Sequence, residues 1–292
     1  MSPTKLALTL TAFAALATGC TRPGATTTDA GVSNGKTTIS VKGSDTMVIL
    51  GQRWAEDYMK SNPALTIQVS GGGSGTGIAA LINGSADICE SSRRMSDKER
   101  GSLEAKRGQP AIETKVAKDA LAVYVNAKSP VREISVAALS RVYRGELTSW
   151  RELGGPDHAI VLYGRENNSG TYGFFKEHVL DGKDFAAATQ TLAGTSAVAS
   201  AVKGDAFGIG YGGIAYVEGV RALGIKRDES SPAVLPSLET AANDAYPLSR
   251  FLYFYTAGEP SPSMKRFIAW VTGPEGQSTI ADVGYYPLPK KS

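Results

Sequence analysis

Residues 70–77 read SGGGSGTG, and an apolar stretch, IAALI, follows them directly at 78–82. The residues before this run, LTIQV at 65–69, alternate apolar and polar side chains as a half-buried strand does. Because glycine loses more backbone freedom on folding than any other residue, such a run is either a linker or a place where backbone comes close to something. A predicted strand and a predicted helix flank the run without a gap, so we interpret it as a strand–loop–helix connection.

The same order of strand, polar loop and helix occurs twice more. An alternating strand at 38–42 ends at the loop 43–46, and apolar residues at helical spacing follow in 47–59. In the second half of the chain, a strand, a polar loop and a helix follow one another within 160–179. This rhythm is typical of right-handed βαβ units and predicts an α/β fold with a mostly parallel sheet. Further strands are expected at 87–90, 120–125, 207–211 and 253–256, and further helices at 96–108, 131–144 and 263–271.

Length and composition bound the class of protein. The chain has 292 residues, of which 42% are hydrophobic and 20% charged, so it can form one large domain or two medium ones. The formal net charge is +3, from 31 basic and 28 acidic residues. This balance, without a dense run of Lys and Arg among aromatic residues, argues against a nucleic-acid partner and against a polybasic membrane patch.

The N-terminal residues form a separate segment. Lys5 precedes an apolar run at 6–16 that is too short to span a membrane and has the size of the central part of a secretory signal. The run ends in ATGC at 17–20, which resembles a bacterial lipobox with Cys20 as the residue that carries lipid. We predict a lipoprotein signal peptide at 1–19. The alternative is an ordinary signal peptide in which Cys20 is incidental.

Residues 20–36 are rich in Thr, Gly, Ala and Ser and carry almost no large apolar side chains. Such a segment cannot bury enough surface to order itself, so we interpret it as a flexible tether before a domain that begins near Thr37. If Cys20 carries lipid, the other cysteine, Cys89, has no partner in the chain and is expected to be a small buried apolar residue. This inventory supports neither a disulfide framework nor a Cys/His metal cluster, and we expect no cofactor and no metal.

Three loops contain the same kind of tripeptide: SDT at 44–46, SGT at 74–76 and SGT at 169–171. Each offers hydroxyls and free backbone N–H groups at a predicted helix N-terminus, where unpaired donors and the helix dipole favour an anion. Ser and Thr are also common N-caps, and that interpretation explains any single loop equally well. It explains less well why glycine accompanies the hydroxyls in two of them, since glycine lets the backbone approach a ligand.

Arg165 precedes the third loop and strengthens the case for an anion site. A guanidinium fork matches two oxygens of a tetrahedral oxyanion. The alternative is a surface arginine paired with Glu166 or Asp157. Arg93 and Arg94 are weaker candidates, because adjacent side chains at a strand end usually point in different directions.

The polar stretches together resemble those of the phosphate-binding proteins of the bacterial high-affinity phosphate ABC transporter, the PstS-like family. The resemblance covers nearly all of the chain after the tether. It rests on the order and spacing of six stretches behind the lipobox: GSDT at 43–46, GSGTG at 73–77, SSR at 91–93, VYRGELTSW at 142–150, GRENNSGT at 164–171 and YPLSR at 246–250.

This resemblance implies a two-lobed α/β fold of the periplasmic-binding-protein type, type II, with the ligand in the cleft between the lobes. The chain would cross between the lobes near 119–122 and again near 248–252. Lobe 1 would comprise 37–120 and 251–292, and lobe 2 would comprise 121–250.

The resemblance also implies a phosphate site. The residues that match the family's phosphate contacts by position are Thr46, Ser74, Arg165, Ser169, Gly170 and Thr171. With their neighbours, the predicted phosphate-binding set is Ser44, Asp45, Thr46, Ser74, Gly75, Thr76, Ser92, Arg165, Ser169, Gly170 and Thr171. No catalytic residue is predicted.

At Ser92 the chain departs from well-known members of the family, which place an aspartate at this position. That aspartate accepts the proton of hydrogen phosphate and repels fully ionised sulfate, so it acts as a repulsive element against the wrong anion. Either Asp45, whose loop already carries predicted contacts, takes over this role, or the selectivity is relaxed. The alternative role of Asp45 is an N-cap that needs no ligand.

The leading hypothesis is a lipid-anchored solute-binding protein that captures inorganic phosphate for the permease subunits of an ABC transporter. It would be an exported monomer attached to an envelope membrane. The alternatives are a binding protein for another tetrahedral oxyanion, such as sulfate, tungstate or an organophosphate, and a non-transport phosphate sensor. An enzyme is not expected, because the only histidines, His158 and His178, lie in no motif that orients a serine.

Overall fold

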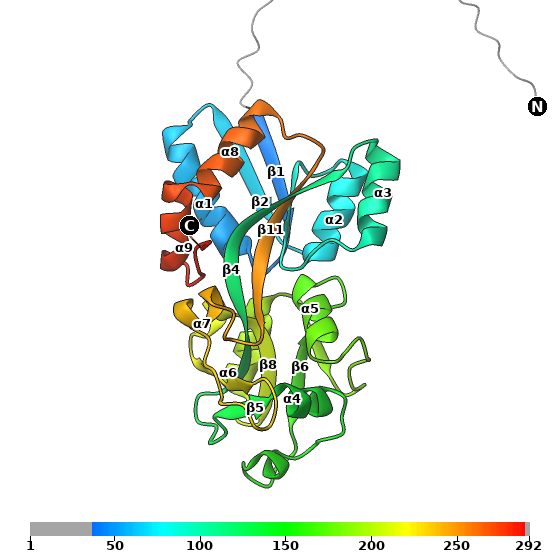
Figure 1. Cartoon of the computed structure of the whole chain (residues 1–292), viewed down its shortest axis with the longest axis vertical. Coiled ribbons are helices and arrows are strands. Elements are labelled where there is room, and N and C mark those ends of the chain that lie inside the picture. Colours follow the sequence, from blue (N-terminus) through cyan, green and yellow to red (C-terminus); the bar gives the residue numbers. More distant parts are fainter. Residues whose placement is uncertain (1–36, 290–292) are drawn as a thin grey trace, which may run out of the picture. The chain divides into compact units, whose positions relative to one another are not determined.

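Two long strands, β4 (Ala111–Asn126) and β11 (Ser249–Ala257), run side by side between the two lobes of the fold (Figure 1). They pair in antiparallel register, with Arg250 directly opposite Asp119. The register shifts once, between Leu252 and Tyr253. These two strands are therefore the connection that positions one lobe against the other.

The computed structural model describes residues 37–289. The predicted signal peptide at 1–19, the lipidated Cys20 and the tether at 20–36 lie outside the described residues and stay predictions. Within 37–289, no helix is both long enough and apolar enough to cross a membrane.

Lobe 1 contains the first two strand–loop–helix units and the C-terminal helices. Its strands β1, β2 and β3 are parallel, and β3 pairs with the antiparallel β11. The first helix turns Leu50, Trp54 and Tyr58 toward the core, at the helical spacing seen in the sequence. The elements are β1 (Thr37–Gly43), α1 (Val48–Ser61), β2 (Leu65–Ser70), α2 (Ser74–Asn83), β3 (Ile88–Ser91), α3 (Asp97–Arg107), α8 (Pro262–Thr272) and α9 (Pro274–Asp282).

Lobe 2 contains the third strand–loop–helix unit. Its strand β6 is parallel to β7 and β8, whereas β4 is antiparallel to β8 and β9. The rings of Tyr143, Phe175 and Tyr211 pack together in its core. The elements are β5 (Glu133–Ser135), α4 (Val136–Tyr143), the 3₁₀-helix η1 (Trp150–Leu153), β6 (Val161–Arg165), α5 (Gly170–His178), β7 (Gln190–Leu192), α6 (Thr195–Gly204), β8 (Gly208–Gly213), the 3₁₀-helix η2 (Ile214–Tyr216), β9 (Val220–Ala222), β10 (Gly224–Lys226) and α7 (Leu238–Ala242).

The chain changes from one core to the other within these connecting strands. Along β4, Ala117 packs in the lobe 1 core, whereas Ala120 packs in the lobe 2 core. On the return, Leu248, directly before β11, belongs to the lobe 2 core, and Leu252 within β11 belongs to the lobe 1 core. The core changes lie close to the expected crossings, and the residue boundaries of the two lobes stay a proposal.

The sheet is mixed, and the prediction of a mostly parallel sheet is wrong for its centre. Its strand order is β2-β1-β3-β11-β4-β8-β6-β7, with β9 paired to β4. The outer strands of each lobe are parallel, as βαβ units require. The central β4 and β11 are antiparallel because one carries the chain out of lobe 1 and the other carries it back.

Helix α2 begins earlier than the sequence predicts. It starts at Ser74, with Gly73 as N-cap, so the second half of the glycine run is the first turn of the helix. A Cβ at Gly77 would lie 2.5 Å from the Lys42 carbonyl oxygen and 2.5 Å from Gly43 Cα. Glycine at position 77 therefore lets this first turn pack directly against β1.

Other boundaries also differ from prediction, most of all in the connecting strands, since β4 begins at Ala111 rather than at residue 120 and β11 begins at Ser249 rather than at residue 253. The helix expected at 131–144 begins only at Val136, because Glu133–Ser135 form the strand β5 that pairs with β10. The strand expected at the start of the stretch 160–179 is β6, and Arg165 is its last residue. A side chain at a strand end is held more firmly than one in a loop, which matters for the site.

Candidate anion-binding site

The loop between β1 and α1 carries three polar side chains, and two of them, Asp45 and Thr46, contact the other lobe. Ser44 is buried, and its Oγ has no hydrogen-bond partner in the described part of the chain. Asp45 Oδ1 accepts a hydrogen bond of 2.7 Å from the backbone N–H of Gly72, which ties the loop to the glycine run. Thr46 is buried, and its Oγ1 lies 2.9 Å from Thr171 Oγ1 of lobe 2.

The first turn of α2 brings Ser74 against Ser92 and against lobe 2. Ser74 Oγ accepts a hydrogen bond of 3.1 Å from Ser92 N and lies 3.4 Å from Ser92 Oγ. Across the lobes, Gly75 N donates to the Asn168 carbonyl oxygen at 2.8 Å. A Cβ at Gly170 would lie 2.3 Å from Ser74 Oγ and 2.7 Å from Ser92 Oγ. The close approach of the lobes therefore requires glycine at position 170.

The start of α5 combines an N-cap with a buried hydroxyl. Ser169 Oγ accepts hydrogen bonds from the backbone N–H groups of Thr171 and Tyr172, so the N-cap interpretation is correct for this serine. Thr171 is fully buried, and its Oγ1 contacts two groups outside lobe 2's own helix: Thr46 Oγ1 at 2.9 Å and Arg250 Nη2 at 3.2 Å.

Arg165 points from the end of β6 toward lobe 1, and its side chain is only 2% exposed. Its Nη2 lies 2.7 Å from Asp45 Oδ2, and its Nη1 donates to Thr195 Oγ1 at 2.8 Å. Among residues 37–289, neither Glu166 nor Asp157 pairs with it, so the surface alternative is wrong. Burial lowers the pKa of Arg165, and the Asp45 carboxylate opposes that effect. A guanidinium remains protonated at any physiological pH.

These contacts join into one hydrogen-bonded cluster that both lobes contribute to. It runs from Arg250 through Thr171 to Thr46, and from Thr46 through Thr195, at 3.5 Å, to Arg165. Hydroxyls and guanidinium groups are the donors that recognise a tetrahedral oxyanion, and α1, α5 and α6 each begin within two residues of a cluster member, Thr46, Thr171 and Thr195 respectively. The arrangement is thus suited to binding an anion.

Comparison with known proteins shows the family of the chain. The model of the PBP superfamily domain matches residues 25–275. The phosphate-binding protein PstS of Pseudomonas aeruginosa is 33% identical over 270 residues, which cover 87% of this chain and 84% of that protein. The chain belongs to the PstS-like family. PstS of Bacillus subtilis is 30% identical over 251 residues, covering 86% of this chain and 80% of that protein.

A solved structure supports the two-lobed fold of this PstS-like chain. The structure is of a Clostridium perfringens protein, assigned to the substrate-binding proteins of phosphate ABC transporters, and contains bound phosphate. It matches with a TM-score of 0.78 at 27% sequence identity and covers 86% of this chain and 100% of that one. The fold class predicted from the sequence, a two-lobed periplasmic-binding-protein fold, is confirmed.

Not every polar residue predicted near the site lies in the cluster of the PstS-like chain. Thr76 is exposed, and its Oγ1 accepts a hydrogen bond from Asn168 Nδ2 at 3.3 Å, at the rim of the lobe contact. Arg93 is paired with both carboxylate oxygens of Glu99, and the Arg94 side chain is 65% exposed. Neither arginine contributes to the cluster.

Three members of the cluster were not predicted from the sequence. Thr195 begins α6, and the GTS stretch at 194–196 repeats the glycine-and-hydroxyl pattern of the other loops, which is a signal that could have found it. Arg250 lies in a stretch that carries the family resemblance, but nothing in the sequence assigns it a role. Asp119 lies in the middle of a buried strand, and only its ion pair with Arg250 in the structure links it to the cluster.

Two buried titratable groups of lobe 1 stand apart from the cluster's hydrogen bonds. Cys89 is buried, as predicted, and forms no disulfide within residues 37–289; burial raises the pKa of its thiol, which makes it a poor nucleophile. Glu90 is completely buried, and neither carboxyl oxygen has a hydrogen-bond partner among the described residues. Burial raises the pKa of Glu90 well above its usual range. Glu90 therefore remains protonated in conditions where an ordinary glutamate is ionised.

The two histidines of the PstS-like chain are occupied with packing. His158 stacks on Phe207 with the ring centres 3.5 Å apart, and His178 stacks on Phe174 at 3.9 Å. Neither imidazole is hydrogen-bonded to a serine hydroxyl within residues 37–289, so no nucleophile–base pair is formed there. In the same range, no group of three or more His, Cys, Asp and Glu side chains could hold a metal ion.

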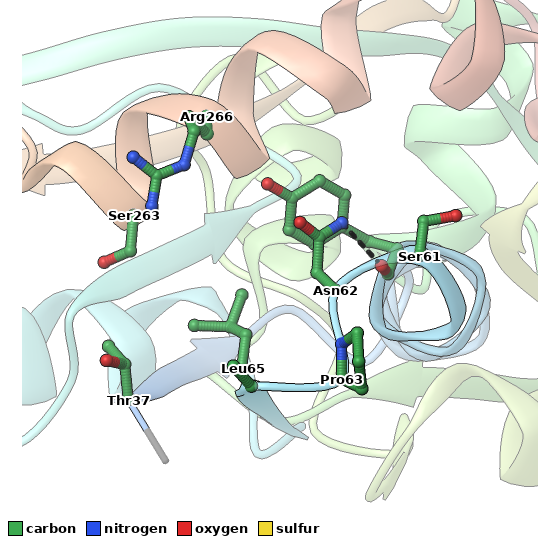
Figure 2. A pocket seen from close by; sticks show the side chains of 9 residues that line it. Thr37, Ser61, Asn62, Pro63, Leu65, Ser263 and Arg266 are labelled. Carbon is green, nitrogen blue, oxygen red and sulfur yellow. Dashed lines mark hydrogen bonds between the residues drawn. The ribbon is translucent and has the colours of Figure 1, made fainter. Parts of the chain in front are cut away.

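A surface pocket of lobe 1 is separate from this site (Figure 2). It has a volume of about 340 Å³ and lies between the end of α1, the start of β2 and helix α8. Its lining includes Ser61, Asn62, Leu65, Ser263 and Arg266. No residue of the predicted phosphate-binding set is among the residues that line it, so this pocket is not the candidate site.

Proposed function

We propose that this PstS-like chain captures inorganic phosphate between its two lobes and delivers it to the permease of an ABC transporter. The observation that carries the proposal is the interlobe cluster, in which the hydroxyls of Thr46 and Thr171 meet beside the buried Arg165. Two relatives named as phosphate-binding proteins and a related structure with bound phosphate support it. The proposed contacts are Ser44, Asp45, Thr46, Ser74, Gly75, Ser92, Arg165, Ser169, Gly170 and Thr171, whereas the exposed Thr76 is left out.

Phosphate would favour the closed arrangement of the lobes because its donors come from both. Thr46 and Ser74 belong to lobe 1, and Arg165 and Thr171 belong to lobe 2. An anion held by both lobes binds the closed state more tightly than the open one and shifts the equilibrium toward it. The movement would take place in the segments where β4 and β11 pass between the cores, and the closed lobes would be what a permease recognises.

Selectivity for phosphate is assigned to Asp45. Ser92 carries a neutral hydroxyl beside Ser74, so it cannot repel a second negative charge. Gly72 N donates a hydrogen bond to Asp45 Oδ1, and Arg165 Nη2 donates to Asp45 Oδ2. Through Arg165, the Asp45 carboxylate is joined to the hydrogen-bonded cluster. An anion that carries a proton can donate it to a carboxylate, and sulfate cannot. If Asp45 does not act in this way, binding of several tetrahedral oxyanions is the alternative.

We further propose that the chain is exported and anchored to an envelope membrane through lipid on Cys20, with 20–36 as the tether, and that it acts as a monomer. The lipobox-like ATGC at 17–20 supports the anchor. Mass spectrometry of the mature N-terminus tests it: a diacylglyceryl adduct on an N-terminal Cys20 is expected. An unmodified mature N-terminus contradicts the anchor and leaves the binding proposal in place.

Isothermal titration of the chain beginning at residue 37 tests the binding function. We expect a micromolar or tighter dissociation constant for phosphate and weaker binding of sulfate. Arg165→Gln should abolish most of the affinity, whereas Arg151→Gln, which removes an exposed arginine of the same lobe paired with Asp157, should not change it. A wild-type chain that binds no phosphate in this range overturns the proposal.

A turnover assay tests for catalysis, and a separate uptake assay distinguishes transport from sensing. No release of phosphate from phosphomonoesters is expected, because the described residues form no nucleophile–base pair. Reconstituted permease and ATPase subunits should take up phosphate only when the binding protein is supplied. A chain that binds phosphate without supporting uptake would favour the sensor alternative.

A further inference from the structure

Arg250 is the second arginine of the interlobe cluster. Its position on β11 sets the orientation of its guanidinium group. Its Nε and Nη2 lie 2.8 Å and 2.7 Å from Asp119 Oδ2, directly across the strand pair. These two nitrogens form one edge of the planar guanidinium group. The adjoining edge, made by Nη1 and Nη2, therefore faces away from Asp119.

That second edge faces the anion-binding cluster. Nη2 reaches Thr171 Oγ1 at 3.2 Å, and Thr171 Oγ1 in turn lies 2.9 Å from Thr46 Oγ1. Nη1 is the neighbouring donor on the same edge. It is buried, and within residues 37–289 it has no hydrogen-bond partner. A buried donor without an acceptor costs free energy unless a ligand or water supplies one.

The surroundings of Arg250 shield it from solvent. Its side chain is 2% exposed, and its Cζ lies 5.3 Å above the ring of Phe174. Asp119, which is 0% exposed, sits on the far edge of the guanidinium. The ion pair therefore acts as an oriented dipole whose positive end is turned toward Thr171. The first arginine of the cluster, Arg165, is paired with Asp45 in the same way, so each of the two arginines has a carboxylate on one side and presents its remaining donors to the cluster.

We propose that Arg250 is a second cationic ligand of the bound anion, with Nη1 donating to an anion oxygen that Thr171 also contacts. The inference rests on the proposed function, because it specifies a further residue of the same site. Since Arg250 belongs to the strand that joins the lobes, the anion would be held by lobe 1, by lobe 2 and by their connection.

Titration of phosphate into wild type and four variants tests this role, with thermal unfolding of each chain to establish that it is folded. Arg250→Gln should weaken phosphate binding about 10- to 100-fold, as expected for loss of a charged hydrogen bond and its charge. Arg250→Lys should recover part of the loss, because it keeps the charge without Nη1. The matched control is Arg100→Gln, which removes an arginine paired with Glu113 in lobe 1, and it should change the dissociation constant less than twofold.

Asp119→Asn distinguishes two roles of Arg250: a ligand of the anion, or a purely structural ion pair with Asp119 that holds β11 against β4. If the charge of Arg250 attracts the anion, removing the opposing carboxylate should leave phosphate binding as tight as in wild type or tighter. If the Arg250–Asp119 ion pair is purely structural, Asp119→Asn and Arg250→Gln should weaken phosphate binding by similar factors, which overturns the proposal. Wild-type affinity in folded Arg250→Gln also overturns it.

If Arg250→Gln and Asp119→Asn do not fold, Arg250→Lys still tests the proposal, since it retains the positive charge opposite Asp119. A dissociation constant equal to that of wild type then overturns the role of Nη1, and a tenfold weaker one supports it. A wild-type chain that binds no phosphate is a different result, because it overturns the proposed function itself.

Discussion

Arg165 Nη2 of lobe 2 lies 2.7 Å from Asp45 Oδ2 of lobe 1, so a guanidinium and a carboxylate that are 120 residues apart form an ion pair across the lobe contact. The other carboxylate oxygen of Asp45 accepts a hydrogen bond from Gly72 N, which fixes its orientation. A carboxylate held in this way beside a buried arginine both positions that arginine and adds a negative charge to the site. Affinity and selectivity should therefore respond differently to its removal.

Asp45→Asn should lower the ratio of phosphate to sulfate affinity by about 10-fold or more, because the neutral amide no longer repels fully ionised sulfate. Titration with each anion measures the ratio. Asp87→Asn is the matched control, since Asp87 also accepts a backbone N–H, from Ser40 at 2.7 Å, on an exposed part of lobe 1. An unchanged ratio in folded Asp45→Asn shows that this residue does not select the anion.

Local pattern predicted much of the candidate site because its residues sit where strands end and helices begin. The hydroxyls at 44–46, 74–76 and 169–171 could be found from the strand–loop–helix order alone, since helix N-termini at one sheet edge converge. The family resemblance then supplied the two-lobed arrangement. Arg165 was found by its charge and its place just before a loop.

Long-range pairing explains what the sequence could not predict. Arg250 matters because the register of β11 on β4 sets it opposite Asp119, and register depends on the whole sheet. The antiparallel centre of the sheet also follows from the chain's two crossings, which have no local signature. Gly77 could be read from the sequence, but the contact with β1 that makes glycine necessary there is a tertiary one.

Gly170→Ala should prevent full closure of the lobes. The added Cβ would lie 2.3 Å from Ser74 Oγ and 2.7 Å from Ser92 Oγ, and overpacking of this kind costs about 1–3 kcal/mol. We expect phosphate to bind about 5- to 150-fold more weakly. Small-angle scattering should show that phosphate no longer reduces the radius of gyration as it does in wild type.

The control for this change is Gly204→Ala at the end of α6, where an added Cβ meets nothing within 4 Å. Alanine suits a helix, so neither helix should be disturbed by the substitution itself. If Gly170→Ala closes and binds as Gly204→Ala does, the contact of Gly170 with the two serines does not limit closure.

Thr195→Val should weaken phosphate binding about 5- to 150-fold, because it removes the hydroxyl that accepts from Arg165 Nη1 at 2.8 Å and leaves a second buried donor of that arginine without a partner. Thr189→Val is the control, since Thr189 Oγ1 is buried and has no partner in the described range. Titration of phosphate into both variants gives their dissociation constants. If the two constants are equal, Thr195 is not part of the site.

Glu90→Gln should stabilise the fold increasingly as the pH rises. Burial raises the pKa of Glu90 in the folded chain, so the unfolded chain releases this proton at a lower pH. Below the ordinary glutamate pKa both states are protonated and the carboxyl contributes no pH dependence. Between the two pKa values the free energy of unfolding falls by up to about 1.4 kcal/mol per pH unit.

Glutamine has nearly the same shape and no proton to lose, so this decline should be absent from Glu90→Gln. Urea unfolding of wild type, Glu90→Gln and the exposed control Glu104→Gln at pH 4, 6 and 8 measures the effect. The difference between Glu90→Gln and wild type should be smallest at pH 4 and largest at pH 8, whereas Glu104→Gln should follow wild type throughout. Parallel curves for all three chains would mean that Glu90 ionises in the folded protein, and the close packing of α1 at Gly51 over its carboxyl would then have to loosen to admit water.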